Sequence, residues 1–264
     1  MKRPGGFVKQ FALLLMAALC LRAQVPVSLG TAASFAVLAG STITNTGATV
    51  VIGDLGLSPG TSVSGFPPGI VTSGLQHITD SPAAQAENDL TTAYNFAAGE
   101  NCPLSNVLPA DIGGAIITPG VYCAATSVGI TGTVTLSGNA SSVFVFQIGS
   151  TLTTASNSVV FLSGGVLPSN VFWQVGSSAT LGTGSAFNGT IMALDSITLT
   201  TLTSLNGRAL ARNGAVTLDD NAIVLSGASR GTPAPPSLIL IMLALALTAA
   251  YSKREWLLRP FRRS

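Results

Sequence analysis

Alternating threonine and serine residues recur through the second half of the chain, and they form its most regular polar pattern. The second hydroxyl of each run falls at 135, 153, 180, 198 and 217, so the steps are 18, 27, 18 and 19 residues. An apolar residue separates the hydroxyls of a run, so on a β-strand both would point to one side. We place on this outward side Thr133, Thr135, Thr151, Thr153, Ser178, Thr180, Ser196, Thr198 and Thr217. Such uncharged groups are poorly suited to a small-ligand pocket but match an extended, repeating, uncharged surface.

The residues able to do acid–base chemistry are scattered. Nine acids lie between residues 24 and 236, and only Asp219 and Asp220 are adjacent. Adjacent side chains on a strand point to opposite faces, so we expect these two to pair with Arg208 and Arg212 rather than to act on a substrate. His77 is expected to make a polar contact beside a helix start. The sequence holds no cysteine–histidine metal set, nucleophile elbow or phosphate loop. We therefore predict no enzyme activity, no metal and no cofactor.

Cysteine usage suggests an oxidising compartment. Cys20 lies in the first 23 residues, which leaves Cys102 and Cys123. In an exported chain two cysteines favour a disulfide over a metal site, and the alternative is a pair of unrelated free thiols.

Charge is concentrated at the two ends. Only 8% of the 264 residues are charged, about a third of the usual share. Between residues 24 and 236 three arginines face nine acids, a net charge of 3 − 9 = −6, without any lysine. This acidic body excludes a nucleic-acid partner.

The two ends predict export and membrane contact. In residues 1–23 the basic residues Lys2, Arg3 and Lys9 precede an apolar stretch, as in a signal peptide. At the other end, a Pro-rich linker (229–236) precedes an apolar segment (237–251) and a basic tail (252–264). This order is typical of a hydrophobic helix that engages a membrane, so we expect a secreted or membrane-anchored protein at the cell surface.

The elements between the ends are short strands and one helix. Asp80 or Ser81, Pro82 and Gly99 bound a helix at about 81–98, with a stripe of small residues. The segments 143–149 and 170–176 match at an offset of 27, which supports the spacing of the hydroxyl runs. A period of 18–20 residues of strand and turn is typical of a β-solenoid, a stack of coils.

Residues 27–228 resemble the microbial ice-binding protein family. The motifs that carry the resemblance are Val27–Leu38, Thr49–Gly60, Thr118–Tyr122, Asn170–Thr180 and Gly207–Asp219. The resemblance implies a mainly β fold over 24–228, a right-handed discontinuous β-solenoid in which the first strands return beside the last coils. It also implies one long helix packed alongside.

The resemblance implies an ice crystal surface as the partner, bound by the flat hydroxyl-bearing face. A second candidate set, similar to a pattern on the ice face of some members, is Thr154–Asn157, Thr183–Ala186 and Thr203–Asn206. The alternative function is a cell-surface adhesion or matrix module on the same fold. A flat neutral face also allows self-association.

Overall fold

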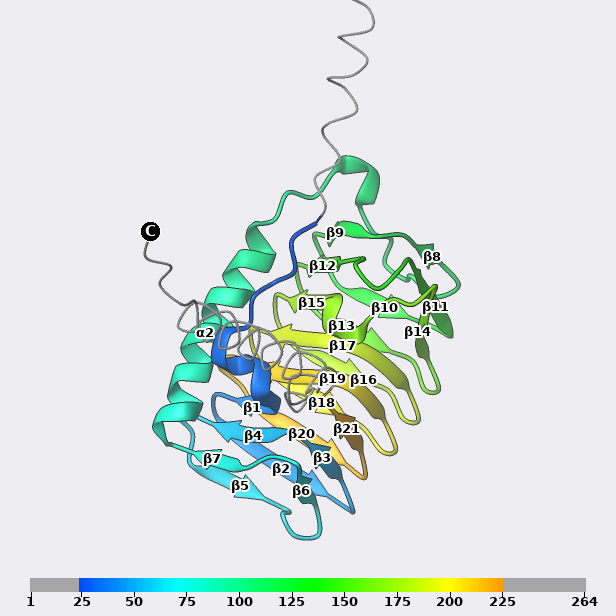
Figure 1. The fold of residues 1–264 in the computed structure, drawn as a ribbon. Coiled ribbons are helices and arrows are strands. Elements are labelled where there is room, and N and C mark those ends of the chain that lie inside the picture. The colour runs from blue at the N-terminus through cyan, green and yellow to red at the C-terminus, as the bar shows by residue number, and fades with distance from the viewer. Residues whose placement is uncertain (1–23, 226–264) are drawn as a thin grey trace, which may run out of the picture. The chain divides into compact units, whose positions relative to one another are not determined.

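The computed structural model describes residues 24–225, which form stacked parallel strands. A seven-stranded sheet makes the first stack: β10 (Val128–Ile130), β13 (Leu152–Thr154), β16 (Ala179–Leu181), β18 (Ile197–Leu199), β20 (Val216–Asp219), β2 (Thr42–Thr46) and β5 (Ser62–Ser64). Every strand pair in it is parallel, as expected when each coil lies on the one before (Figure 1).

A fourteen-stranded sheet supplies the other two stacks. The second stack runs β8 (Ile116–Ile117), β11 (Thr133–Ser137), β14 (Val159–Ser163), β17 (Ala186–Ala193), β19 (Ser204–Ala211), β21 (Ala222–Val224), β3 (Val50–Ile52) and β6 (Ile70–Thr72). The third stack contains β9 (Gly120–Ala124), β12 (Phe144–Ile148), β15 (Val171–Val175), the second halves of β17 and β19, β1 (Phe35–Ala39), β4 (Asp54–Leu57) and β7 (Gln76–Ile78).

Two glycines let the long strands β17 and β19 pass from the second stack to the third. Gly189 and Gly207 are register partners with φ of 115° and 154°. A Cβ at Gly207 would lie 1.9 Å from the carbonyl oxygen of Gly189. Only glycine therefore allows these backbones to approach at the bend.

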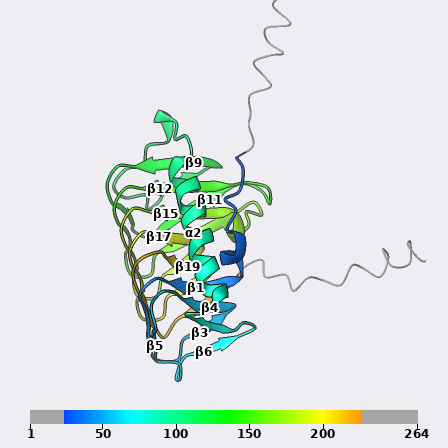
Figure 2. The same cartoon turned by 90° about the vertical axis from the view of Figure 1, so that its left-hand side faces the viewer.

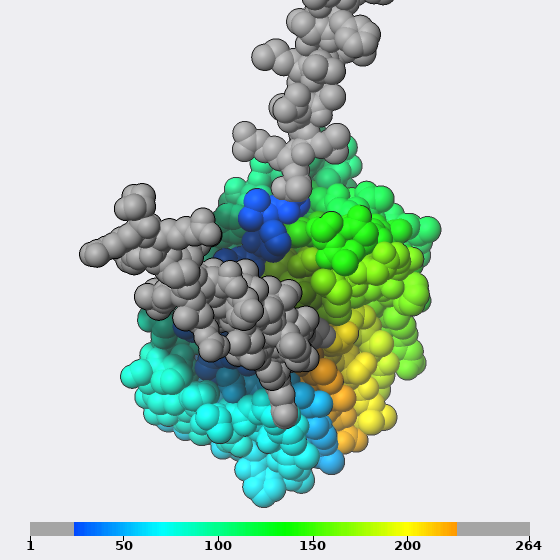
Figure 3. Space-filling view, viewed as in Figure 1, coloured from blue at the N-terminus to red at the C-terminus, as the bar shows by residue number. Residues whose placement is uncertain are grey.

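The coils do not stack in the order of the sequence. The amino-terminal strands β1, β2 and β3 pair with β19, β20 and β21. In Figure 3 the last coil, in orange, accordingly lies between yellow and blue segments. The expected discontinuous β-solenoid is confirmed.

Side chains directed inward fill the core of the solenoid. Phe146 and Trp173 stack with ring centroids 4.0 Å apart, and Tyr122 and Phe187 extend the row on either side. Phe146 and Trp173 are register partners, so the predicted offset of 27 is confirmed. Stacking of like side chains from successive coils fixes the register of the solenoid.

Helix α2 (Ser81–Gly99) covers the third stack, as Figure 2 shows. Its buried stripe is mostly alanine, with Leu90 and Tyr94, so the helix lies close to the strands. Gln147 donates to the carbonyl oxygens of Ala97 (2.8 Å) and Glu100 (2.7 Å). Gln174 donates to the Tyr94 hydroxyl at 2.8 Å. These bonds fasten the helix along its length.

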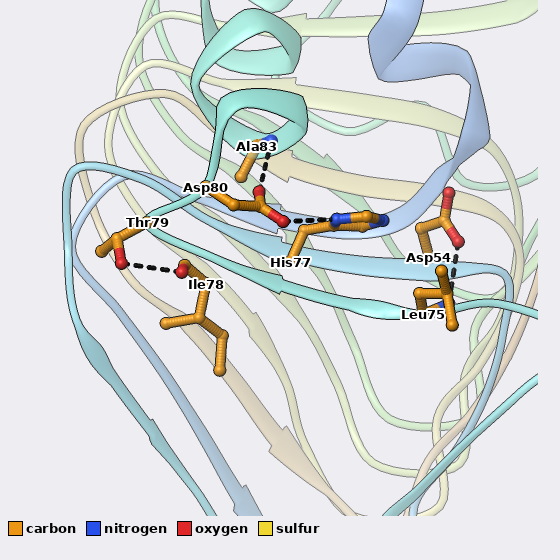
Figure 4. A network of polar contacts seen from close by, with 7 residues as sticks. All are labelled: Asp54, Leu75, His77, Ile78, Thr79, Asp80 and Ala83. Carbon is orange, nitrogen blue, oxygen red and sulfur yellow. Dashed lines mark hydrogen bonds and ion pairs between the residues drawn. The ribbon is translucent and has the colours of Figure 1, made fainter.

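The start of α2 is held by a polar network (Figure 4). Asp80 accepts a hydrogen bond from the backbone N–H of Ala83 at 3.0 Å, and its other oxygen lies 2.7 Å from Nδ1 of His77. The Ala83 bond is the main reason why the pKa of Asp80 lies below its ordinary value. The expectation that His77 makes a polar contact beside the helix is confirmed.

Short 3₁₀ turns and a disulfide complete the described chain. The turns are η2 (Gly30–Ser34), η3 (Leu104–Asn106) and η4 (Pro168–Asn170). Cys102 and Cys123 are bonded, with Cα atoms 6.1 Å apart, so the predicted disulfide is present. Within residues 24–225, no helix has the length and apolar character needed to cross a membrane. The predicted signal peptide (1–23), linker (229–236), apolar helix (237–251) and basic tail (252–264) lie outside the described residues.

The predicted pairing of the two arginines with Asp219 and Asp220 is wrong. Arg208 donates instead to the carbonyl oxygen of Ala33, at 3.1 Å from Nε and 2.9 Å from Nη2. Arg212 donates to Thr91 at 3.2 Å and lies over the Tyr94 ring. Both arginines come after Gly207, where β19 bends, so they are directed toward α2 and η2. Asp219 instead ends β20 of the first stack, and Asp220 follows it.

Candidate functional site

The outward side of the first stack carries a rank of aligned hydroxyls. Hydrogen-bonded register places in one row Gly129, Thr153, Thr180, Thr198, Thr217, Thr44 and Ser64. We call this row the central rank, and the outward side of the seven strands the threonine face. Neighbouring members lie about 4.8 Å apart, because that is the spacing of paired strands.

The hydroxyls of the central rank are accessible. Thr44, Thr153 and Thr217 are exposed, and Thr180 and Thr198 are half-buried. The hydroxyls of Thr44 and Thr217 lie 3.4 Å apart. Among residues 24–225, the hydroxyls of Thr153, Thr180 and Thr198 have no side-chain or backbone hydrogen-bond partner, so they are available to solvent.

A flanking rank of hydroxyls lies two residues before the central threonine of several coils. These hydroxyls form hydrogen bonds within the protein. Ser178 accepts a hydrogen bond from the backbone N–H of Ser196 at 3.3 Å. Ser196 accepts one from the N–H of Ala215 at 3.0 Å. Thr151 donates to Ser127 at 2.7 Å. This flanking rank ties each coil to its neighbour at the turn that enters the threonine face.

The other border of the threonine face is less uniform. Thr200 donates to the carbonyl oxygen of Leu181 at 2.7 Å, and Thr201 donates to the carboxylate of Asp219. Asp219 is the register partner of Thr46. A carboxylate therefore lies at the edge of the face, while the central rank is free of charge.

Comparison with known proteins agrees with this architecture. A family model described as ice-binding-like matches residues 37–224. An ice-binding protein of Nostoc sp. (strain HG1) is 54% identical over 198 residues, which cover 74% of this chain and 72% of that protein. The chain belongs to the ice-binding-like family.

Solved structures place the family fold on the same residues. An ice-binding protein from an Antarctic biological consortium has a TM-score of 0.75 and 53% identity, and covers 78% of this chain and 94% of its own. One from the Antarctic ascomycete Antarctomyces psychrotrophicus has a TM-score of 0.73 and 41% identity, and covers 76% of this chain and 98% of its own. The shared fold therefore makes up nearly the whole chain of those two proteins.

Two threonines predicted for this face lie elsewhere in the ice-binding-like domain. Thr133 and Thr135 belong to β11, which pairs with β14 and β8 in the second stack. The strand that precedes β13 in the first stack is β10, where Gly129 is the register partner of Thr153. Because Gly129 has no side chain, β10 lacks the hydroxyl pattern, whereas the run at 133–135 has this pattern on another strand.

Sequence periodicity missed the amino-terminal part of the threonine face. Thr44 and Ser64 belong to the central rank, and Thr42 and Ser62 are paired beside them. The run Thr42-Ile-Thr44 has the alternating pattern of the later runs. It was missed because its coil lies beside the last coil of the domain, far away in sequence.

The second candidate set, Thr154–Asn157, Thr183–Ala186 and Thr203–Asn206, does not form an exposed row. Thr154 and Thr203 are buried, at 4% and 0% exposure. Thr154 lies 3.0 Å from the Ser185 hydroxyl, and Thr203 donates to the carbonyl oxygen of Gly182 at 3.1 Å. These hydroxyls stabilise the corner between the first two stacks.

The titratable groups of the ice-binding-like domain do not form a catalytic constellation. In residues 24–225, no three His, Cys, Asp or Glu side chains are placed to hold a metal ion. Burial lowers the pKa of Arg208 to about 10. Burial of Glu87, a residue of α2, raises its pKa to about 8 against the opposing effect of Arg212. The relatives named above are called ice-binding proteins.

Proposed function

We propose that this chain binds ice through the central rank of the threonine face. The observation that carries the proposal is the row of accessible hydroxyls, three of which have no partner within residues 24–225. In a parallel sheet the row is straight and evenly spaced. A planar crystal surface is the kind of ligand that such a row fits.

The chemistry of threonine suits this task. Its hydroxyl donates and accepts hydrogen bonds, so it can take the place of a water molecule. Its methyl group adds apolar surface, which favours the displacement of disordered water. A charged side chain would hold its own hydration shell and compete with the ordered layer.

Rigidity lowers the cost of docking onto ice. Threonine has a restricted χ1 angle, and each interior strand of the first stack is paired on both sides. Little side-chain or backbone freedom is then lost on binding, which preserves the small gain from each contact. The alternative of an adhesion module is not favoured, since the matched relatives are ice-binding proteins.

Substitution on two neighbouring coils tests the proposal. Residues 24–225 would be used, because they hold the described fold and a solved relative that covers 78% of this chain is itself covered to 94%. Thr180→Tyr with Thr198→Tyr should raise the concentration needed to inhibit ice recrystallisation at least about tenfold, because two rings would hold the face away from ice. Thr92→Tyr, on the exposed side of α2, is the matched control and should leave inhibition unchanged.

Circular dichroism of all three proteins would verify that the fold is intact. Full inhibition by the doubly substituted, folded protein would place ice binding on another face. Absence of inhibition by the wild-type protein would end the proposal.

The same proposal includes export from the cell. The basic and apolar pattern of residues 1–23 supports it, and the Cys102–Cys123 disulfide is typical of an oxidising compartment. Amino-terminal sequencing of protein recovered from the medium or envelope should begin near Gln24. An intact Met1 on that protein would contradict cleavage.

A further inference from the structure

The second stack presents an outward face that the proposed function does not use. We call it the apolar face. Its exposed apolar members are Ile116, Phe161, Val224, Ile52 and Ile70. Its outward positions between them are occupied by Thr133, Thr135, Val159, Ala186, Asn188, Ser204, Asn206, Ala222, Val50 and Thr72. Within this set of described residues there is no charged side chain.

Several of these side chains are well exposed to solvent on one face of one sheet. Ile116 is 74% exposed, Phe161 53% and Ile70 49%. Thr135, Asn188 and Asn206 lie among these apolar side chains, so the face is mixed but uncharged, and the number of exposed apolar side chains on it suits a site of association. By contrast, α2 covers the third stack, so that the equivalent apolar side chains there are buried.

The relief of the apolar face is uneven. Phe161 projects from β14, and beyond it lies a shallow hollow lined by the small residues Ala186, Ser204 and Ala222. Asn206 donates to Asn188 at 2.9 Å, and Asn188 donates to the carbonyl oxygen of Val160 at 2.8 Å. These bonds fix the floor of the hollow. Side chains as different as phenylalanine and alanine do not make a plane that could match a crystal surface.

We propose that the apolar face is the contact between two copies of this chain. Phe161 projects from β14, and the hollow lies next to it over the small residues of β17, β19 and β21. When two such faces meet about a two-fold axis, the Phe161 ring of each copy lies over the Ala222 side of its partner. A two-fold contact of one face with itself is the commonest arrangement of a homodimer.

The size of the face sets the strength of the contact. Eight strands at about 4.8 Å, with side chains spread over about five residues at about 3.3 Å, cover roughly 600 Å². Two copies together then bury roughly 1,200 Å², the lower end of the range for specific interfaces. The dimer is therefore weak and reversible. Absence of charge removes the repulsion and desolvation that would oppose face-to-face contact.

Dimerisation leaves the threonine faces free, because the two surfaces belong to different sheets. Each dimer would carry two threonine faces. A second attachment to the same crystal then becomes intramolecular, which raises avidity without a new contact to ice.

Sedimentation velocity of residues 24–225 over a range of concentrations tests the proposal. The wild-type protein should shift from monomer to dimer with rising concentration. Phe161→Lys should raise the dimer dissociation constant at least about tenfold, because a charge would be buried in both copies. Leu104→Lys is the matched control: Leu104 is 94% exposed in η3, outside the apolar face, and its substitution should leave the constant unchanged.

A milder variant, Phe161→Ser, covers the case in which Phe161→Lys does not fold, and it should also weaken the dimer. A wild-type monomer up to about 1 mM would overturn the proposal, because even a weak specific dimer forms there. A dimer that survives Phe161→Lys and is lost in Thr198→Tyr would assign self-association to the threonine face. Ice activity of Phe161→Lys should fall no further than that of the wild-type protein diluted to monomer, and a larger fall would make the apolar face an ice contact instead.

Discussion

Thr180 of β16 and Thr198 of β18 are register partners, and neither hydroxyl has a hydrogen-bond partner within residues 24–225. Ser178 and Ser196, which directly precede these strands, accept backbone N–H groups from the next coil. The two adjacent rows of hydroxyls therefore differ in their hydrogen bonding. The flanking rank holds the coils together, and the central rank is left free for a ligand.

The first prediction tests whether strand register or sequence spacing correctly identifies the threonines that bind ice. Thr44 belongs to the central rank although it lies 173 residues from its partner Thr217. Thr133 fits the periodicity but lies on β11. Thr44→Tyr should weaken inhibition of ice recrystallisation, and Thr133→Tyr should not. The opposite ranking would show that ice is bound by the second stack.

The second prediction concerns the flanking rank. Ser196→Ala removes the acceptor for the N–H of Ala215 and should lower the free energy of unfolding by about 1 kcal/mol. Thr198→Val, two residues away, removes a hydroxyl that has no partner in the described chain, and should leave that free energy nearly unchanged. Urea denaturation of both variants measures the difference. Equal losses would contradict the division between the two rows.

The third prediction is a pH dependence of stability that arises from Glu87. One carboxyl oxygen of Glu87 is buried without a hydrogen-bond partner in the described residues, and its pKa is raised to about 8. The folded state then holds a proton that the unfolded state releases near pH 4.5. Stability should therefore fall as pH rises from about 4.5 through about 8.

Glu87→Gln keeps the shape of the side chain without its ionisation. It should flatten this fall and raise the free energy of unfolding at pH 9 by about 1–2 kcal/mol. Denaturation at pH 5, 7 and 9 provides the comparison with the wild-type protein. An unchanged slope in the variant would mean that another group is responsible.

The fourth prediction concerns the disulfide, which closes a loop with a sequence separation of 21. Replacement of Cys102 and Cys123 by serine should lower the free energy of unfolding by about 3 kcal/mol, mainly because the unfolded chain gains freedom. Ice-recrystallisation inhibition per folded molecule should be unchanged, because Cys123 lies on β9 of the third stack. A loss of activity at full folding would connect this end of the solenoid to the threonine face.

Much of the fold follows from local pattern. The alternation of threonine with apolar residues predicts strands, and the steps from 153 to 180, 198 and 217 match hydrogen-bonded partners. Helix α2 follows from its cap at Asp80 and from Pro82. These signals can be read because each depends on residues that are close in sequence or repeat at a nearly constant step.

The membership of the threonine face does not follow from pattern alone. Gly129 holds a position where the other coils have a hydroxyl, and Thr133 imitates the pattern on another sheet. A step of 24 residues separates Gly129 from Thr153, since loops between coils vary in length. Periodicity fixes the spacing of similar runs, but it does not say which side of the coil a run occupies.

By itself, the sequence determined that this protein is built from short parallel strands around an apolar core, with one capped helix and regularly spaced, uncharged hydroxyls. Only the tertiary structure decided which hydroxyls share a plane and which are already hydrogen-bonded. It joined Thr44 to Thr217, and it turned Arg208 and Arg212 away from Asp219 and Asp220. The physical reason is that strand pairing acts across the stack of coils, and this stack brings the first strands beside the last.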